Sequence, residues 1–411
     1  MPEARAPLDP RRLSPELARL FSTDTIRRES RALLDRAERG ESDWFSVDRA
    51  RLPEIAARVA EVTRAAYPSL LVPVHGRYRH FDVGGAPRLA GLRARLVGRA
   101  PAERARAMID LVMVSVLLDA GAGAVWRYGD ASTGASAGRS EGLAVASLRM
   151  FEAGLFSDDP GDPLRVDAAR LARLRVADVA RGLQVDDSNP MDGLDGRAAL
   201  LASLGAALAA ETTVFGASGR PGGLFDTAPS STGEVDAQLL LSSLLCGLAE
   251  IWPGRLRLDG VSLGDVWEHP ALPGSLVPFH KLSQWLAYSL FEPLEEGGLC
   301  VTGGAALTGL PEYRNGGLFV DGGALSLRDP SLYREAHLPG SPLVVEWRAC
   351  TLSLLDDLHP LVCAALDRSP TDLPLASVLE GGTWATGRLL ARERRSDGAP
   401  PISIVSDGTV F

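Results

Sequence analysis

The chain has 411 residues, of which 45% are hydrophobic, and it carries a net charge of -9. This composition supports a sizeable buried core, and the acidic charge argues against binding to the phosphate backbone of nucleic acids or to an anionic membrane surface. No run of 18 apolar residues occurs, and the polar N-terminal stretch lacks the apolar segment of a secretory signal. The four scattered cysteines form no CxxC pair, so we expect reduced thiols and a cytoplasmic location.

Helical patterns dominate the chain from end to end. Apolar residues recur at steps of three and four in ten segments, which predicts a helix in each. These segments are residues 13–39, 48–66, 102–120, 141–153, 167–182, 197–210, 234–251, 279–291, 349–366 and 375–391. Four short patches favour strands, at residues 69–74, 317–320, 342–346 and 402–405. We therefore predict a mainly α protein with a few short β-strands.

The glycine- and proline-rich connections between these segments are short. None is long enough or simple enough in composition to be an inter-domain linker, and no internal repeat is found. We predict a single helical domain over residues 1–411. Within it, residues 1–68 form an N-terminal helical region and residues 69–411 form a core that carries the motifs.

The first polar motif is PVHGRYRHF, at residues 73–81. On a strand, His75, Arg77 and Arg79 would share one face, because side chains alternate along a strand. Two guanidinium groups beside an imidazole suit a phosphate or a carboxylate. The alternative is a solvated or salt-bridged edge segment.

A second motif, LDAGAGAVWRY at residues 118–128, follows a long apolar helix. Its GxG spacing is a weak dinucleotide signal, because it follows a helix rather than a strand and lacks the third glycine. The small residues favour a helix end with close backbone packing. Trp126 could still stack on a ligand.

A third motif has glycines two residues on either side of Ser140, which is the spacing of a nucleophile elbow. Such an elbow needs a preceding strand, whereas residues 132–137 are small and typical of a loop. We therefore predict that Ser140 caps the N-terminus of the helix at residues 141–153.

The fourth motif contains Lys281, the one lysine among the 43 lysine and arginine residues. Lysine and arginine do similar work on most surfaces, so a retained lysine marks a candidate site where a planar guanidinium will not serve. His280 precedes it, and Gln284 lies on the same face of the predicted helix. A last remaining surface lysine is the alternative interpretation.

Two carboxylates follow in LTGLPEYRNGGLFVD, at residues 307–321. Glu312 and Asp321 flank a turn that contains Arg314. Paired carboxylates suit proton transfer and the stabilisation of a cationic transition state, and Lys281 nearby would keep one of them ionised or hold a substrate oxygen. A buried structural ion pair is the alternative.

Eight motifs, spread from about residue 70 to the last residue, together resemble the uracil catabolism protein 4 family. They are VPVHGRYRHFDVGG, LLDAGAGAVWRY, RSEGLAVASLRMFEAG, PFHKLSQWLAYSL, LTGLPEYRNGGLFVD, VEWRA, LEGGTWATGR and SDGTVF. The resemblance implies a part in a pyrimidine-degrading route of fungi and bacteria that leads through uridine-derived ribosylurea to urea.

A more distant similarity is to queuosine salvage proteins, which are N-glycoside hydrolases with a DNA-glycosylase-like fold. Those proteins carry a Phe-Tyr-Lys-Arg-Ala-Gln helix, followed at similar distance by Leu-Thr-x-x-x-Asp-Tyr-Arg-Val-Pro-Gln. The residues similar to these motifs are Phe279, Lys281, Gln284, Leu307, Thr308, Tyr313 and Arg314. Glu312 stands where that family has its catalytic Asp, and Asn315-Gly316-Gly317 replaces Val-Pro-Gln. The segment from Leu118 to Trp126 is similar to a Leu-Asp-x-x-x-x-x-x-Trp segment of the same family. This similarity implies the same fold class.

The two resemblances together imply a hydrolase that cleaves the N-ribosyl bond of ribosylurea or its 5′-phosphate. In such an enzyme Glu312 would stabilise an oxocarbenium-like charge or activate water, and Asp321 would orient the water or the ribose hydroxyls. Lys281 and Arg314 would fix the carboxylate geometry or bind phosphate. The other expected substrate-binding residues are His280 and Gln284 for the urea, His75, Arg77 and Arg79 for the anionic end, Trp126 for the pocket wall, and Tyr313 and Asn315.

Two alternatives stay open at this point. One is an amidohydrolase that acts on a ureido intermediate with the same carboxylates, and the other is a non-catalytic nucleotide-binding or regulatory subunit. We expect no metal or organic cofactor, because HxxxH and HExxH are absent and the five-residue separation of His75 and His80 is not a helical ligand spacing. The expected partner is a nucleoside- or ribosylurea-like small molecule, with neither nucleic acid nor membrane.

Overall fold

Helices make up most of the chain. The computed structural model describes residues 6–119, 121–123, 125–252 and 256–405, and the structural statements below concern these residues. The α-helices are α1 (Pro15–Leu20), α2 (Thr23–Glu38), α3 (Leu52–Ala66), α4 (Tyr78–Phe81), α5 (Arg88–Leu96), α6 (Pro101–Leu117), α7 (Arg139–Glu152), α8 (Ala168–Ala172), α9 (Val176–Gly182), α10 (Leu194–Ala210), α11 (Thr212–Phe215), α12 (Leu224–Thr227), α13 (Ala237–Gly247), α14 (Lys281–Glu296), α15 (Tyr313–Asp321), α16 (Pro342–Ala365), α17 (Leu375–Val378) and α18 (Trp384–Arg394). The prediction of a mainly α protein is confirmed.

The strands are short and pair two by two. They are β1 (Phe45–Val47), β2 (Arg127–Asp130), β3 (Ala135–Gly138), β4 (Glu234–Asp236), β5 (Arg257–Leu258), β6 (Val261–Ser262), β7 (Val266–Glu268), β8 (Leu276–Pro278), β9 (Cys300–Thr302), β10 (Leu325–Leu327), β11 (Ala336–His337) and β12 (Ser403–Ile404). In the described ranges every sheet has two strands, with β1–β10, β2–β3, β5–β6 and β7–β8 antiparallel and β4–β9 and β11–β12 parallel. These sheets join segments of the chain and form no layer of their own.

Three of the four predicted strands are wrong. Residues 317–320 belong to α15, and residues 342–346 form the first turns of α16, which begins with Pro342. Short apolar runs fit a buried helix as well as a strand, and the residues that start each helix decided the outcome. Residues 69–74 are irregular, so the residues after them do not continue a strand and Arg79 lies in α4. The predicted strand at 402–405 is confirmed in part as β12.

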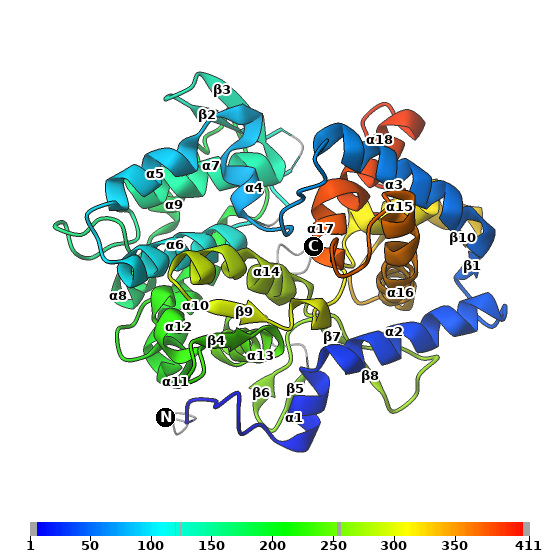
Figure 1. The fold of residues 1–411 in the computed structure, drawn as a ribbon, viewed down its shortest axis with the longest axis horizontal. Helices are drawn as coiled ribbons and strands as arrows, with labels where there is room; N and C mark the ends of the chain where they lie inside the picture. The colour runs from blue at the N-terminus through cyan, green and yellow to red at the C-terminus, as the bar shows by residue number, and fades with distance from the viewer. Residues whose placement is uncertain (1–5, 120, 124, 253–255, 406–411) are drawn as a thin grey trace.

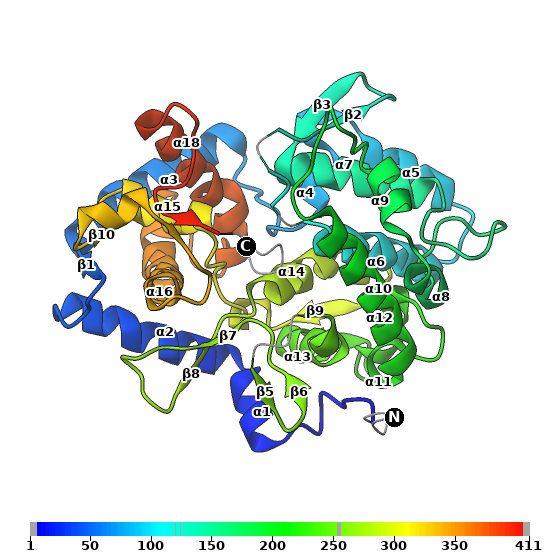
Figure 2. The ribbon, with the colours of Figure 1, turned by 180° about the vertical axis from the view of Figure 1, so that it is seen from behind.

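Two groups of helices flank the central helix α14 (Figure 1). Helices α3, α15, α16, α17 and α18 lie on one side of it, and α4, α5, α6 and α7 lie on the other. Seen from behind, α8, α10, α11 and α12 gather on the side of α6, away from α15 to α18 (Figure 2). Helix α14 packs on α6 and α13, and α15 packs on α16 and α18. The first residues of α14 and α15 therefore lie in the interior of the molecule.

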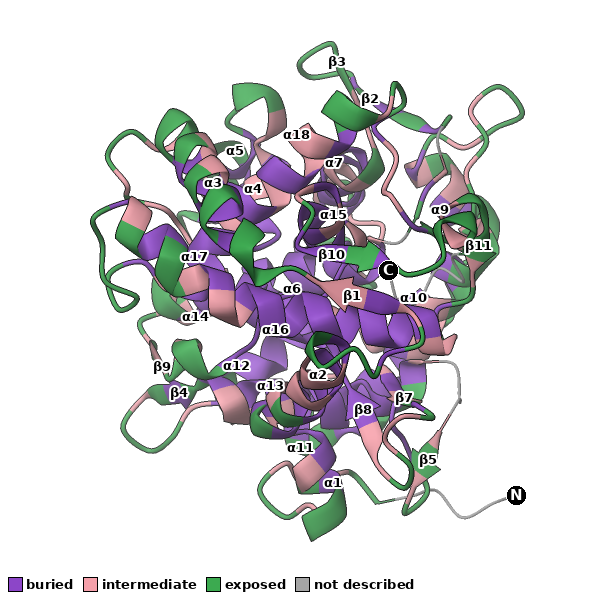
Figure 3. Cartoon of the chain, turned by 90° about the vertical axis from the view of Figure 1, so that its right-hand side faces the viewer, coloured by how far each residue is buried: buried purple, intermediate pink, exposed green. Residues whose placement is uncertain are grey.

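Helices α6 and α16 form the middle of the core. Buried residues are concentrated along both helices, while exposed residues lie mainly at the periphery (Figure 3). One cluster of buried apolar side chains extends from Leu17 to Ile402. The single-domain organisation stays a prediction. Within the described ranges, no helix is both long and apolar enough to cross a membrane.

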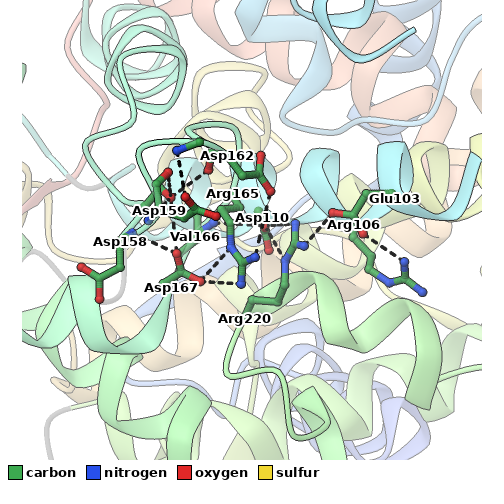
Figure 4. A network of polar contacts seen from close by, with 12 residues as sticks. Glu103, Arg106, Asp110, Asp158, Asp159, Asp162, Arg165, Val166, Asp167 and Arg220 are labelled. Atoms are coloured by element: carbon green, nitrogen blue, oxygen red, sulfur yellow. Dashed lines mark hydrogen bonds and ion pairs between the residues drawn. The ribbon is translucent and has the colours of Figure 1, made fainter. Parts of the chain in front are cut away.

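A buried polar network fastens two loops to α6 (Figure 4). The fully buried carboxylate of Asp110 accepts hydrogen bonds from Arg220 Nε at 3.0 Å and Nη2 at 2.6 Å, from the amide of Gly222 at 2.7 Å and from the amide of Val166 at 3.1 Å. Arg220 also donates to Glu103 at 2.7 Å. A buried charge is tolerated where it is paired and hydrogen-bonded, as Asp110 is here.

Candidate functional site

A cavity of about 450 Å³ lies where the two groups of helices meet α14. Its walls come from the start of α14, the segment that leads into α15, the end of α6, the start of α7, α18 and the segment before β12. The polar residues that line it are His75, His80, Asp119, Arg139, Ser140, Lys281, Glu312, Tyr313, Arg314, Asn315 and Asp397. Trp285 and Trp384 add aromatic faces. A concave site with convergent polar groups is the usual form of a small-molecule site.

Glu312 is the N-cap of α15. Its two carboxylate oxygens accept hydrogen bonds from the backbone amides of Arg314 at 2.7 Å and Asn315 at 2.6 Å, so the side chain is fixed in one orientation. The N-terminus of a helix favours a negative charge at this position. Burial raises the pKa of Glu312, while Lys281 and the two amides act in the opposite direction. The result is a buried, immobilised carboxylate on the cavity wall.

Lys281 is the first residue of α14 and lines the same cavity. Its Nζ makes no hydrogen bond or ion pair within the described part of the chain, and it lies 6.0 Å from the centre of the Trp285 ring. Burial lowers the pKa of the ammonium, and the carboxylates of Glu312 and Asp119 oppose this change. The ammonium is therefore available to a ligand beside the carboxylate of Glu312.

A hydrogen-bonded clasp holds the two motifs together. Gln284 on α14 accepts from the backbone amide of Thr308 at 2.8 Å and donates to the Thr308 hydroxyl at 2.6 Å and to the carbonyl of Phe279 at 3.0 Å. Tyr288, one turn further along α14, donates to the Thr308 carbonyl at 3.0 Å. Gln284 is buried and does not line the cavity. Its contacts place the start of α15 against the start of α14.

A second support comes from Asp265, on the loop before β7. Its carboxylate accepts hydrogen bonds from both terminal nitrogens of Arg348 at 2.7 Å and from the backbone amide of Lys281 at 3.0 Å. Arg348 also donates Nε to the carbonyl of Pro311 at 3.3 Å. Burial by itself raises the pKa of Asp265, but the charge and hydrogen bonds of Arg348 outweigh it and lower the pKa to about 2. One ion pair thus positions the residues next to both Lys281 and Glu312.

The opposite wall carries a cluster of Arg77, His80, Asp119 and Ser140. The Ser140 hydroxyl donates to Asp119 at 2.6 Å and lies 3.0 Å from His80 Nδ1. Arg77, fully buried behind them, donates Nη1 to the Ser140 hydroxyl at 3.0 Å and pairs with Asp119 at 3.1 Å. Burial, with the nearby Arg77 charge, lowers the pKa of His80 to about 4, so this imidazole is neutral near pH 7.

This geometry corrects the predicted role of Ser140. Helix α7 starts at Arg139 with Gly138 as its N-cap, and no side chain caps it. The predicted loop at residues 132–137 is only half right, because residues 132–134 form a turn whereas residues 135–137 belong to β3, which ends at Gly138 immediately before the helix. The Ser140 hydroxyl faces the carboxylate of Asp119 instead of the helix amides. Small residues hid the strand, since they give no apolar alternation.

Two buried polar atoms on cavity-lining residues have no partner within the described chain. They are Asn315 Oδ1 and Trp285 Nε1. Asn315 Nδ2 donates to the Leu310 carbonyl at 3.0 Å, which fixes the amide so that the oxygen is the free atom. An unsatisfied buried polar atom is costly and calls for a partner. Here both atoms are buried within the wall of the cavity.

Two residues of the first motif are bound by the protein itself. His75 lines the cavity, and its Nδ1 lies 2.7 Å from Glu380, which also accepts from the Tyr67 hydroxyl at 3.0 Å. Arg79 is paired with Glu292 on α14 and does not line the cavity. The residues expected to share a strand face therefore point to three different places.

Four more of the predicted residues lie outside the cavity. His280 is buried and hydrogen-bonds the carbonyl of Leu20 at 3.0 Å. Asp321, the last residue of α15, accepts hydrogen bonds from the two terminal nitrogens of Arg395 at 2.9 and 2.6 Å. Trp126 is buried, with Nε1 bonded to the Leu183 carbonyl at 2.9 Å. Gln284 is held in the clasp, and the substrate contacts expected of these residues stay predictions.

Sequence reasoning missed seven polar or aromatic residues that line the cavity: His80, Asp119, Arg139, Ser140, Trp285, Trp384 and Asp397. All but Asp397 lie inside a motif already singled out, but nothing in the local pattern distinguished them from a cap, a helix end or a core aromatic residue. Among the described residues, no group of three or more His, Cys, Asp or Glu side chains is arranged to hold a metal ion.

Comparison with known proteins identifies the family. The family model described as "Protein of unknown function (DUF1688)" matches residues 19–411. "Protein urg3" of Schizosaccharomyces pombe is 42% identical over 406 residues, which cover 96% of this chain and 99% of the relative. "Uracil catabolism protein 4" of Lachancea kluyveri is 37% identical over 431 residues, which cover 95% of this chain and 98% of the relative. The resemblance to the uracil catabolism protein 4 family is confirmed, and the chain belongs to the family described as DUF1688.

Proposed function

We propose that this protein acts in uracil catabolism by hydrolysing the N-ribosyl bond of ribosylurea or of its 5′-phosphate, with release of urea. The name of the relative "Uracil catabolism protein 4" supports the pathway. The reaction is supported by one observation above all: the immobilised carboxylate of Glu312 shares a cavity with the free ammonium of Lys281.

Cleavage of a ribosyl C–N bond develops positive charge on C1′ and the ring oxygen. A carboxylate that already faces this position stabilises the charge without having to reorganise, and the effect is larger in a site shielded from water. Glu312 has this property because two backbone amides hold its oxygens in place. Water adds to C1′, and urea leaves with the proton that balances the reaction.

The Lys281 ammonium suits a ureido group. It donates to the carbonyl oxygen of the urea, and Asn315 and Trp285 lie in the wall of the same cavity. Stronger hydrogen bonding to the carbonyl as negative charge moves onto the departing urea favours the transition state over the ground state. Asp119 and Ser140, on the opposite wall, suit the hydroxyl groups of a ribose.

We also infer a DNA-glycosylase-like fold. The similarity to queuosine salvage proteins rests on two motifs, and the clasp between Gln284 and Thr308 joins these motifs in space. Glu312 occupies the place of the catalytic Asp of that family, one methylene longer, and its position at the N-cap of α15 leaves the carboxylate on the cavity wall. The replacement of Asp by Glu is therefore compatible with the same chemistry on a different leaving group.

The test replaces Glu312 by Gln and measures urea and sugar release from ribosylurea and its 5′-phosphate by chromatography. Loss of an electrostatic group of this kind costs about 3 kcal/mol, or roughly a hundredfold in rate. Glu295→Gln, an exposed glutamate on α14, is the matched control and keeps the wild-type rate. Urea release at the wild-type rate by a folded Glu312→Gln variant would reject the proposal.

One observation favours a second candidate, an amidohydrolase that acts on a ureido group. Ser140 lies two residues after the end of β3, has glycine two residues on either side, and contacts both Asp119 and His80. In a Ser-His-Asp triad, however, the carboxylate binds the histidine, whereas here it accepts from the serine. The same chromatographic assay separates the candidates. Ammonia and a carbamate as products, abolished by Ser140→Ala, would favour this second reaction.

A further inference from the structure

A second pocket, of about 390 Å³, opens beside the main cavity and is lined by arginines. Five guanidinium groups reach it from separate parts of the chain: Arg127, Arg139, Arg314, Arg388 and Arg392. The acidic residues of its lining are Glu141 and Asp397. The lining of this pocket is therefore positively charged, although the chain as a whole has a net charge of -9. We call this site the arginine pocket.

The arginine pocket and the main cavity adjoin each other. Arg139, Arg314 and Asp397 line both of them. Arg314 lies two residues after Glu312 in the chain, so the carboxylate and the arginine pocket meet at the start of α15. A ligand with its reacting carbon at Glu312 can therefore extend an anionic end between the guanidinium groups.

Several of these guanidinium groups are available to a ligand. Arg139 and Arg392 make no hydrogen bond or ion pair within the described residues. Arg314 donates Nη1 to the Gly398 carbonyl at 2.9 Å, and Arg388 donates to Glu141 at 2.9 Å. Burial lowers the pKa of Arg314, and the nearby charges of Arg139 and Arg388 lower it further. Their mutual repulsion is relieved when an anion binds between them.

The backbone at Arg139 supports the same conclusion. Its φ is 53°, in the left-handed region that residues other than glycine seldom adopt. Such strain persists where the surrounding structure holds it, and it is concentrated at functional sites. The conformation turns the chain between β3 and α7 and leaves the Arg139 side chain at the junction of the cavity and the arginine pocket.

We propose that the arginine pocket binds the phosphate monoester of the substrate, so that the enzyme acts on a phosphorylated riboside in preference to the free one. This inference rests on the proposed N-ribosyl hydrolysis. Guanidinium groups bind phosphate oxygens in bidentate fashion, and several converging forks match a dianion better than a single carboxylate. The unphosphorylated riboside leaves these charges without a partner.

The first experiment measures binding without catalysis. Isothermal titration calorimetry with inorganic phosphate and with ribose 5-phosphate is carried out on the wild type, Arg139→Gln, Arg392→Gln and the exposed control Arg368→Gln. We expect each pocket variant to weaken ribose 5-phosphate binding about tenfold to a hundredfold, the value of a charge-assisted hydrogen bond. The control keeps wild-type affinity, and thermal melts establish that all variants are folded.

The second experiment compares kcat/KM for ribosylurea and its 5′-phosphate. The wild type prefers the phosphorylated substrate, and Arg392→Gln reduces that preference mainly through KM. Equal use of both substrates by the wild type overturns the phosphate inference and leaves the proposed hydrolysis standing. Arginine-dependent binding of ribose 5-phosphate with no hydrolysis of either substrate supports the pocket and rejects the proposed function. Equal affinity for inorganic phosphate and ribose 5-phosphate, or binding unaffected by the arginine variants, also overturns the inference.

Discussion

The contribution of the Asp265–Arg348 ion pair to the stability of the site can be measured. Asp265 accepts both nitrogens of the buried guanidinium and the amide of Lys281, and Arg348 in turn contacts the Pro311 carbonyl next to Glu312. Asp265→Asn keeps the size of the side chain and removes its charge. We expect this change to lower stability and to loosen both halves of the site.

The magnitude follows from the pKa of Asp265, which the structure lowers from a usual value of 3.8 to about 2. This difference corresponds to roughly 2 to 3 kcal/mol of stability near neutral pH. Breaking a buried ion pair costs about 3–5 kcal/mol in other proteins, so the two arguments agree within their precision. With m of about 3–5 kcal/mol/M for a long chain, the urea midpoint falls by about 0.5 to 0.8 M.

Equilibrium urea unfolding followed by far-UV circular dichroism measures the change, and urea release measures its effect on activity. Asp178→Asn is the matched control. The pKa of Asp178 is also lowered to about 2, but by Arg175, whose side chain is exposed. Asp178 itself is buried, but water screens a pair whose guanidinium is exposed, so the control moves the midpoint far less. Equal losses in the two variants would refute the argument that burial gives the Asp265 pair its value.

The pH dependence supplies an independent check on Asp265. Because its folded pKa lies below the unfolded one, its contribution is complete above about pH 4 and is lost as the pH falls through about 2. The stability difference between the wild type and Asp265→Asn should therefore close between pH 4 and pH 2. A difference that stays constant over this interval would show that the charge of Asp265 is not its source.

Two further predictions concern α15 and its carboxylate. A Cβ at Gly387 would overlap the backbone carbonyl oxygen of Arg314. Because overpacking of this kind destabilises a protein by about 1–3 kcal/mol, Gly387→Ala should lower the melting temperature and the rate of urea release. Gly91→Ala, on a helix face with open space, should raise the melting temperature slightly, and a loss there would contradict the packing argument. Lys281 lowers the pKa of Glu312, so Lys281→Met should move the acid limb of the pH–rate profile to higher pH. If the acid limb does not move, Glu312 is not the group whose ionisation controls the reaction.

The helical part of the fold was predictable because long segments carry a strong 3.6-residue pattern. Helices α6, α10 and α14 fall close to their predicted ranges. The residues that begin and end helices were less visible. Glu312 starts a helix where the apolar run after it suggested a strand, and Phe21 and Ser22 interrupt a pattern that continues from α1 into α2. Periodicity identifies elements, whereas side-chain caps decide their limits.

The site was predictable where the signal was chemical and local. The scarcity of lysine drew attention to Lys281, and the motif after it supplied Glu312. The cluster of Arg77, Asp119 and Ser140 was not predictable, because packing brings together residues that are far apart in the chain. Within one motif, some polar residues line the cavity and others make structural contacts. Of Lys281 and Gln284, three positions apart on α14, one faces the cavity and the other holds Thr308.

The carboxylate of Glu312 is both the reacting group in the proposed mechanism and the cap of α15. Its ionisation and the local order of the helix end are therefore linked, and linkage is reciprocal. Any molecule that binds the charged form also tightens the first turn of α15, and protonation of the carboxylate loosens it. Amide hydrogen exchange at Arg314 and Asn315 thus reports, from the backbone, the protonation state of a group at the centre of the cavity.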